Sequence, residues 1–438
     1  MRGDAITARR SGWFPTIPRE RLVSIIGGSA GNLVEWYDWF AYASFAIYFA
    51  PVFFPKADPT AQLFSTATIF AAGFVMRPIG AWVMGRFADA RGRKAGLTLS
   101  VGLMCGGSLL LSLAPTYATA GLLGPATLLL ARVLQGLSLG GEYGASATYL
   151  AEMAPKKNRG FWASFQYMTL CGGQLCAIAV AVVLQGFLSE AELTAWGWRV
   201  PFVIGALLAL GVYLLRRNLA ETPSFQNQAV DRPASTATLL WRNHRRESIL
   251  VAMLSAGGGL GAYTYTSYMQ KYLFNTVGFG KATATYIVAA ALVWFTAMQP
   301  VFGALADRFG RKPMLLVFGI GGAIAAVPVF LTLETTTSPV VATLILLIPL
   351  TLQSGYSANN ALVKAELFPA HIRGLGVALP YAIGNALFAG TLEMVALALK
   401  GAGMERLFYV YVAAVIAMAG VATLLLPETR DRSLITTD

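Results

Sequence analysis

Charged residues are scarce in this sequence. Only 12% of its 438 residues are Asp, Glu, Lys or Arg, whereas 56% are hydrophobic. Soluble domains carry about 25% charged residues, and long apolar stretches are typical of transmembrane helices. The low charge therefore excludes an ordinary soluble domain and indicates a protein embedded in a membrane.

Cysteine and histidine are also rare. Cys105, Cys171 and Cys176 all lie in apolar stretches, so no disulfide framework is indicated. His244 and His371 fall in predicted cytoplasmic segments, and no cluster has the spacing of metal ligands. We interpret the cysteines as small apolar fillers and expect neither a metal site nor a cofactor. No Cys/His/Asp nucleophile set supports an intramembrane enzyme either.

Apolar stretches dominate the rest of the chain. Most exceed the ~20 residues that a helix needs to cross the hydrocarbon core. We therefore predict an all-α membrane protein with 12 transmembrane helices. The polar, Arg-rich segment 1–21 lacks an apolar core, so we expect no cleavable signal peptide. The predicted spans are residues 22–50, 62–88, 96–114, 123–152, 161–188, 200–217, 248–273, 283–306, 314–332, 339–366, 374–399 and 406–426.

Basic residues outnumber acidic ones, with 33 Lys and Arg against 21 Asp and Glu and a net charge of +12. If the N-terminus is cytoplasmic, twelve alternating spans place most of these cations on the cytoplasmic side. That asymmetry follows the positive-inside rule. We therefore expect both termini in the cytoplasm and no nucleic-acid partner. The exceptions are Lys56, Arg199, Lys271, Lys281, Lys400 and Arg406 near the outer face, and Arg77 and Arg132 within the membrane.

A basic, glycine-punctuated turn between two apolar spans occurs twice. Glycine permits left-handed turns and close helix approach, and an aspartate can accept hydrogen bonds from the N-terminus of a neighbouring helix. We interpret the turn as a conformational latch rather than a contact with cargo. The two copies are Gly85-x3-Asp89-x2-Gly92-Arg93-Lys94 and Gly303-x3-Asp307-x2-Gly310-Arg311-Lys312.

Two more markers recur in the same order in both halves of the chain, AEMAP with AELFP and Glu221-Thr222 with Glu428-Thr429. Repeats of this kind indicate two six-helix bundles related by pseudo-two-fold symmetry. The predicted division is a cytoplasmic arm (1–21), an N-terminal bundle (22–217), a cytoplasmic linker (218–247), a C-terminal bundle (248–426) and a cytoplasmic tail (427–438).

Ionisable residues inside the predicted spans are the first candidates for a functional site. Arg77 and Arg132 are the cations; Glu35, Asp38 and Glu142 are the acids. Such residues are costly in a bilayer and usually mark a solute or proton pathway. The alternative is ion pairs that merely lock helices together. Burial disfavours ionised carboxyl groups, so uptake of a proton by the acids is plausible.

Further polar residues lie in the spans. Gln166, Tyr263 and Tyr268 could hydrogen-bond a polar solute, although tyrosines near helix ends often form the interfacial belt instead. Lys271 and Glu393 are expected near the outer face, where snorkelling explains them without any function.

Glycines at four-residue spacing give the fourth span a smooth face. Gly136, Gly140 and Gly144 predict tight packing against a neighbouring helix.

These motifs resemble a known family. The repeated turn is similar to the loop signature of the major facilitator superfamily. Within it, the segments GNLVEWYDWF, FAAGFVMRPIGAWVMGR, RVLQGLSLGGEYGASATYLAE, WGWRVPF and AELFPAHIRGLG resemble the metabolite:H⁺ symporters, over about Gly28 to Gly403. The resemblance implies alternating access and proton-coupled uptake of an anionic metabolite. It is most detailed for members that carry α-ketoglutarate (2-oxoglutarate).

We therefore expect a monomeric symporter in a bacterial inner membrane, driven by the proton gradient, whose partners are the bilayer, a small anionic metabolite and H⁺. Our hypothesis is that Arg77 and Arg132 clamp the carboxylates of a dicarboxylate, aided by Gln166, Tyr263 and Tyr268. Glu35, Asp38 and Glu142 would handle the proton. Citrate, shikimate and the osmolytes betaine and proline stay open as cargo, and a solute sensor or an intramembrane enzyme is the alternative class.

Overall fold

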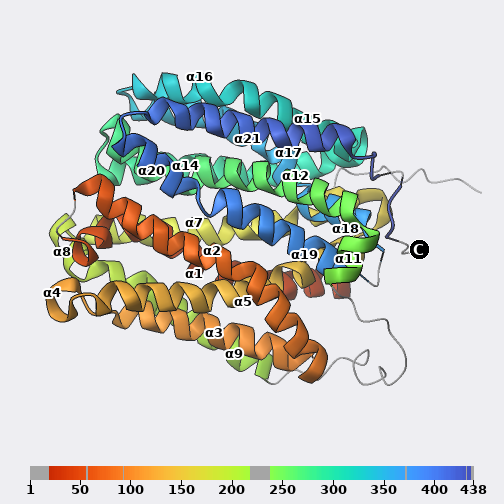
Figure 1. Ribbon diagram of the computed structural model, residues 1–438, viewed down its shortest axis with the longest axis horizontal. Helices are drawn as coiled ribbons and strands as arrows, with labels where there is room; N and C mark the ends of the chain where they lie inside the picture. The colour runs from red at the N-terminus through yellow and green to blue at the C-terminus, as the bar shows by residue number, and fades with distance from the viewer. Residues whose placement is uncertain are drawn as a thin grey trace, which may run out of the picture.

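Helices account for all regular structure in the described part of the chain. The computed structural model describes residues 19–55, 58–91, 93–217, 237–369, 372–430 and 432–435. Long helices lie roughly side by side along one direction (Figure 1). In hydrocarbon, every backbone N–H and C=O group must be satisfied within the protein, and a helix does this within one segment.

The first half of the chain forms six long rods. Short helices at their ends are η1 (Lys156–Asn158), α4 (Tyr117–Ala120), α8 (Glu190–Ala195) and η2 (Gly197–Arg199). The rods are α1 (Arg19–Phe53), α2 (Pro59–Arg91), α3 (Arg93–Leu113), α5 (Leu123–Met153), α6 (Arg159–Ala163) continued by α7 (Phe165–Phe187), and α9 (Val200–Arg217).

The second half repeats this arrangement, with several rods interrupted by π-helical turns. Helix α11 (Ala237–Asn243) lies within the predicted linker. The rods are α12 (Arg245–Tyr263) with η3 (Thr264–Tyr268), α13 (Met269–Tyr272) and η4 (Leu273–Val277); α14 (Lys281–Phe309); α15 (Arg311–Leu316) with η5 (Val317–Gly322) and α16 (Ala323–Glu334); α17 (Pro339–Ser357) with α18 (Asn360–Leu367); α19 (Arg373–Gly384) with η6 (Asn385–Ala389) and α20 (Leu392–Gly401); and α21 (Glu405–Leu425).

Helix packing reveals the internal symmetry. In the first half, α1 packs on α7, α2 on α5 and α3 on α9. In the second half, α12 packs on α19, α14 on α17 and α16 on α21. The contacts between the halves are paired in the same way, because α2 packs on α19 and α20 while α14 packs on α6 and α7. The two halves are thus six-rod bundles related by a pseudo-two-fold rotation.

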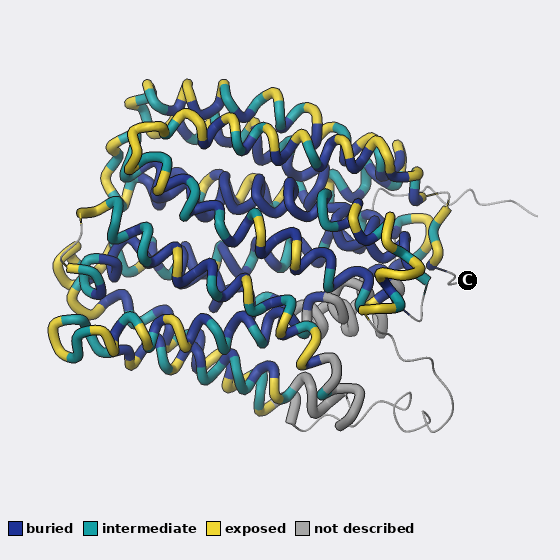
Figure 2. Tube along the Cα trace, viewed as in Figure 1, coloured by how far each residue is buried: buried dark blue, intermediate teal, exposed yellow. Residues whose placement is uncertain are grey.

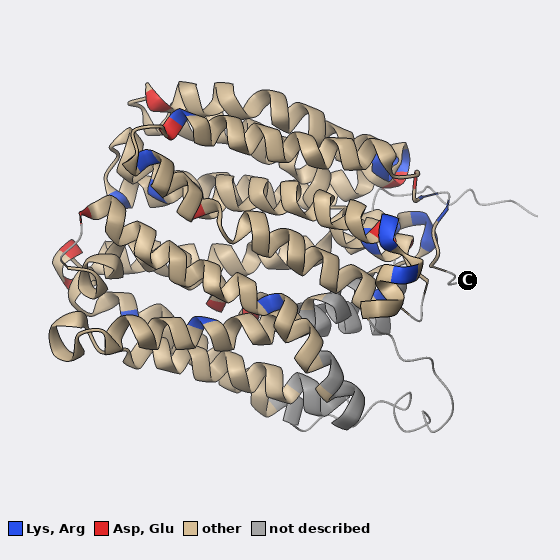
Figure 3. Ribbon diagram, in the orientation of Figure 1, with Lys and Arg blue, Asp and Glu red and all other residues tan. Residues whose placement is uncertain are grey.

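Length and composition agree with a bilayer environment. Within the described residues, 9 helical segments are long and apolar enough to cross a membrane. Large apolar side chains are exposed on outer helix faces, including Phe187, Leu207, Ile324 and Leu344. Figure 2 shows buried residues along the inner faces of the rods and exposed ones outside. Figure 3 shows Lys, Arg, Asp and Glu gathered mainly at the two ends of the rods, as lipid contact along their middle requires.

Glycines bring α5 and α2 into backbone contact. A Cβ atom on Gly136 would lie 2.1 Å from the carbonyl oxygen of Gly73, and one on Gly140 would lie 2.1 Å from that of Arg77. The close packing predicted from the glycine spacing is therefore present at these two positions. The surroundings of Gly144 lie outside the described side chains. This contact fixes the backbone of Arg77, so it also positions the side chain discussed below.

We predict that replacing Gly140 by Ala destabilises the protein, because the added methyl group must displace the Arg77 backbone. Overpacking of this kind costs about 1–3 kcal/mol. Thermal unfolding of the detergent-purified protein, followed by tryptophan fluorescence, should show a lower transition temperature. Gly106→Ala in α3 is the matched control, since nothing lies within 4 Å of its added Cβ. Equal transition temperatures for the two variants would contradict the packing argument.

Candidate functional site

Two buried guanidinium groups share one tryptophan. Arg77 of α2 is 2% exposed and Arg132 of α5 is fully buried. Their Cζ atoms lie 4.0 and 3.8 Å from the centroid of the Trp39 ring. The negative face of an aromatic ring attracts a cation, and this attraction is strongest when water is excluded. Trp39 of α1 therefore stabilises both charges inside the first bundle.

Arg132 is connected to a carboxylate through an amide. Its Nη1 donates to Oε1 of Gln135 at 2.6 Å, and Nε2 of Gln135 donates to Oδ2 of Asp38 at 2.6 Å. Asp38 is fully buried. The predicted cation and acid thus lie in one hydrogen-bonded chain, with Gln135 between them. Arg132 lines neither of the two inner cavities described below.

Arg77 faces the second bundle. Its Nη2 lies 3.5 Å from the hydroxyl oxygen of Tyr263 in α12, and its Cζ lies 4.1 Å from the centroid of Phe74. Its Nε and Nη1 have no hydrogen-bond partner among the described residues. Arg77 also lines a small cavity with Tyr143 of α5 and Tyr381 of α19. Its guanidinium is therefore held mainly by aromatic rings, at the boundary of the two halves.

A second cavity lies centrally between the halves. The enclosed space measures about 10 Å³, which is room for one water molecule. The π-helical turns η3 and η6 contribute Thr266 and Asn385 to its wall, and such turns often occur at functional sites. Other polar residues in the wall are Gln174, Tyr263, Tyr356, Asn360 and Tyr381.

The remaining predicted site residues are dispersed. Tyr268 packs against Phe408 and lines neither cavity, and Gln166 of α7 is buried with no hydrogen-bond partner for its side chain among the described residues. Glu35 is buried in α1. Glu142 lies in α5, but its side chain is outside the described ones.

One sequence expectation is wrong. The side chains of Lys271 and Glu393 do not snorkel, since they form an ion pair and are 2% and 4% exposed. Both side chains are shielded from lipid, because α13 and α20 face the protein interior at Lys271 and Glu393. Lys364, which was not predicted to be a cation within the membrane, is fully buried in α18. Its place in the predicted tenth span is the signal that could have identified it.

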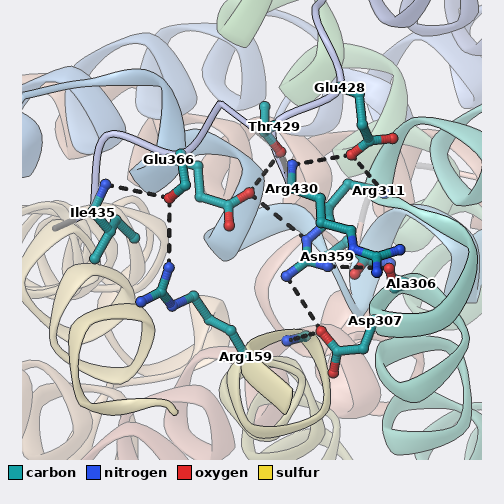
Figure 4. Close-up of polar contacts among 12 residues, drawn as sticks. Arg159, Ala306, Asp307, Arg311, Asn359, Glu366, Glu428, Thr429, Arg430 and Ile435 are labelled. Carbon is teal, nitrogen blue, oxygen red and sulfur yellow. Dashed lines mark hydrogen bonds and ion pairs between the residues drawn. The ribbon is translucent and has the colours of Figure 1, made fainter. Parts of the chain in front are cut away.

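The second copy of the repeated turn lies where the two halves meet. This end of the molecule also carries α11 and residues 427–430 and 432–435, and is called the linker end below (Figure 1). Oδ1 and Oδ2 of Asp307 each accept a hydrogen bond at 2.8 Å, from the backbone N–H groups of Gly160 and Phe161. The carboxylate at the end of α14 therefore caps α6 of the other half (Figure 4).

Basic and acidic side chains continue this contact. Arg311 pairs with Asp307 at 3.2 Å and lies 3.7 Å from Glu366 of α18. Glu428 accepts hydrogen bonds from the backbone N–H groups of Arg311 and Lys312, at 2.9 and 3.0 Å. The preceding Gly310 has a φ of 101°, a conformation that favours glycine and ends α14. We name Asp307, Arg311, Glu366 and Glu428 the linker-end latch (Figure 4).

The first copy of the turn is only partly described. Gly85 and Asp89 lie in α2 and Arg93 begins α3, but their surroundings are outside the described side chains. Gly92 lies outside the described residues. Gly303 of the second copy touches the first half, since a Cβ atom on it would lie 2.6 Å from the carbonyl oxygen of Gly160.

The opposite end of the molecule is also closed. Gln185 of α7 donates to Thr285 of α14 at 3.0 Å, and Lys281 pairs with Glu190 of α8 at 2.6 Å. Both contacts join the two halves. Glu190 is 67% exposed, so this ion pair contributes little stability. The described residues therefore join the two halves at both ends of the molecule, with small cavities between them.

Comparison with known proteins agrees with this architecture. The family model described as Major Facilitator Superfamily matches residues 33–392. The xylose transporter XylE from E. coli, solved in a partially occluded inward open conformation, superposes with a TM-score of 0.76 at 18% sequence identity, over 93% of this chain and 98% of that one. At this identity the likeness concerns the fold.

Two curated relatives are more similar in sequence. The alpha-ketoglutarate permease of Escherichia coli (strain K12) is 48% identical over 408 residues, which cover 93% of this chain and 94% of that protein. The citrate-proton symporter of Klebsiella pneumoniae is 32% identical over 385 residues, 86% of this chain and 85% of that protein. With the family match and the 12-helix, two-bundle fold, these similarities show that the chain belongs to the major facilitator superfamily of membrane transporters.

Proposed function

We propose that this protein is a proton-coupled symporter that imports a small dicarboxylate, with 2-oxoglutarate as the expected cargo. The relative at 48% identity, named an alpha-ketoglutarate permease, supports the cargo, and the relative named a citrate-proton symporter supports proton coupling. We place the protein as a monomer in a bacterial inner membrane, with the linker end and both termini facing the cytoplasm. No cofactor is needed, because the proton gradient drives uptake.

The observation that carries this proposal is Arg77. A buried guanidinium without a carboxylate partner is costly, and its planar fork fits a carboxylate in a bidentate way. The Nε and Nη1 atoms, which have no hydrogen-bond partner in the described part of the chain, would be available to a ligand between the halves. Tyr263 lies beside the same guanidinium and would contribute a hydroxyl group. Charge-assisted hydrogen bonds to a carboxylate would then replace part of the aromatic contact.

We assign the proton to the chain that ends at Asp38. A proton on Asp38 removes a negative charge next to Gln135 and Arg132, and Arg132 shares Trp39 with Arg77. The site becomes more positive and binds an anion more tightly. By reciprocity, a bound anion then favours the proton, which is the coupling that a symporter needs. Glu35 and Glu142 are the further carboxylates of the proposed proton path, and Gln166 and Tyr268 the more distant cargo contacts.

Transport would require the two ends to open in turn. An inner space of about 10 Å³ cannot hold a dicarboxylate, so the halves must separate before cargo enters. We propose that the linker-end latch, together with the first copy of the turn (Gly85, Asp89, Gly92 and Arg93), holds the cytoplasmic side closed. Gln185 and Glu190 would do the same on the outer side.

We predict that Arg77→Ala weakens 2-oxoglutarate binding about 100-fold, since losing two charge-assisted hydrogen bonds costs about 3 kcal/mol. Calorimetry on purified protein measures this dissociation constant. Arg199→Ala is the control. The Cζ atom of Arg199 also lies over a tryptophan ring, 4.2 Å from the centroid of Trp198, but Arg199 lines neither inner cavity and lies near the end of the molecule opposite the linker end. Unchanged affinity in Arg77→Ala would contradict the proposed cargo site.

We also predict that Asp38→Asn abolishes accumulation against a gradient but leaves exchange of labelled for unlabelled substrate. The amide can still accept the hydrogen bond from Gln135, whereas it cannot bind a transferable proton. Proteoliposomes with and without an imposed pH gradient measure the two activities. The control is Asp58→Asn, an exposed aspartate at the start of α2. Gradient-driven accumulation that survives in Asp38→Asn would refute the assignment.

A third prediction concerns the latch. Asp307→Ala removes the two hydrogen bonds that join Asp307 to the first half, and it also removes the ion pair with Arg311 of its own half. The variant should therefore shift the protein toward an open linker end. Spin labels on cysteines that replace the exposed Lys157 and Arg308 should report longer distances. Glu190→Gln, which weakens the opposite end, should not lengthen them. An unaltered distance distribution in Asp307→Ala would rule out the latch.

A further inference from the structure

Lys364 is a buried cation that the charge pattern of the sequence did not single out. It lies in α18, on the second bundle, and is fully buried. Its Nζ has no hydrogen-bond partner among the described residues. The buried Lys271, by contrast, is paired with Glu393. An unpaired ammonium group is costly to bury, so its retention requires an explanation.

Three tyrosine rings surround this ammonium group. The Nζ of Lys364 lies 4.1 Å from the centroid of Tyr381, 5.8 Å from that of Tyr356 and 5.9 Å from that of Tyr143. Tyrosine faces attract a cation at these distances. The rings belong to both halves, since Tyr143 comes from α5 and stacks on Tyr381 of α19 with centroids 3.7 Å apart.

The same tyrosines connect Lys364 to the proposed cargo site. Tyr356 and Tyr381 line the central cavity, and Tyr143 and Tyr381 line the small cavity with Arg77. Asn360, one helical turn before Lys364, also lines the central cavity and donates to the hydroxyl group of Tyr143 at 2.9 Å. The ammonium group therefore lies directly behind the wall of the space between the halves.

The nearest described acid along the chain does not pair with Lys364. Glu366, two residues later, belongs to the linker-end latch, where it contacts Arg311 and accepts a hydrogen bond from Thr429 at 2.6 Å. A purely structural lysine would gain most from a carboxylate of the protein. Lys364 and Arg77 instead have the same arrangement, a cation on aromatic faces whose nitrogens include some without a hydrogen-bond acceptor among the described residues.

We propose that Lys364 binds the second carboxylate of the cargo, so that a dicarboxylate bridges Arg77 of the first half and Lys364 of the second. This inference rests on the proposed function and deepens it. Separation of the stacked Tyr143 and Tyr381 would let one carboxylate reach each cation. A bridged anion links the two halves, whereas a monocarboxylate reaches one cation only. Selection for two carboxylates and closure around the cargo then have the same physical origin.

The test compares two ligands of equal carbon number. 2-Oxoglutarate has two carboxylates, whereas 2-oxopentanoate has a methyl group in place of the distal one. We expect the unaltered protein to bind 2-oxoglutarate about 100-fold more tightly, as for the loss of charge-assisted bonds. Lys364→Met should bind 2-oxoglutarate only as tightly as 2-oxopentanoate, and its affinity for 2-oxopentanoate should not change. Lys157→Met, which removes an exposed charge, should preserve the discrimination.

A second readout excludes a variant that merely misfolds. Cys171 lines the central cavity, so in a Cys105→Ala/Cys176→Ala background its alkylation by a maleimide reports occupancy of that space. Saturating 2-oxopentanoate should protect Cys171 equally in Lys364→Met and in the parent. Retained discrimination in a folded Lys364→Met variant would overturn the role of Lys364 alone. Failure of the parent to bind any dicarboxylate would instead overturn the proposed function.

Discussion

Positive charge buried in the protein interior is the constraint on which this structure depends. Arg77, Arg132 and Lys364 are buried at positions where hydration is lost, and desolvating an ion costs several kcal/mol even in a relaxed protein. Aromatic faces of Trp39 and Tyr381 stabilise them without neutralising them. The need to stabilise buried cations in this way explains why aromatic residues are dense around α1, α2 and α12. A protein carboxylate at each cation would stabilise its charge further, but in the proposed function it would compete with the anionic cargo.

The two ends of the molecule differ in strength, and the difference follows from their chemistry. At the linker end, Asp307 caps a helix of the other half and Glu428 accepts from two backbone N–H groups. These are charge-assisted hydrogen bonds in partly buried places. At the opposite end, the Glu190 side chain of the Lys281–Glu190 pair is 67% exposed, so water and salt screen the pair. The contact at this end is therefore weaker than the contact at the linker end.

The features that arise from local sequence patterns could be predicted from the sequence. Apolar runs predicted the helices, the Gly136 and Gly140 spacing predicted close packing, and the repeated turn predicted two similar halves. The spacing could not show which way a side chain points once helices assemble. Lys271 was therefore expected to snorkel near the outer face, and Lys364 was not recognised as a buried cation. Their burial depends on tertiary contacts with Glu393 and Tyr381, which come from distant parts of the chain.

The same argument separates the roles of the two arginines. From sequence, Arg77 and Arg132 were equivalent, since both are lone cations in apolar spans. In the structure, Arg132 is tied through Gln135 to Asp38, whereas Arg77 faces the other half. In the proposed function, one cation lies next to the acid that takes up the proton and the other lies next to the cargo, and both contact Trp39. Coupling between proton and cargo would then need no long pathway, because the field of one charge acts on the other across a single ring.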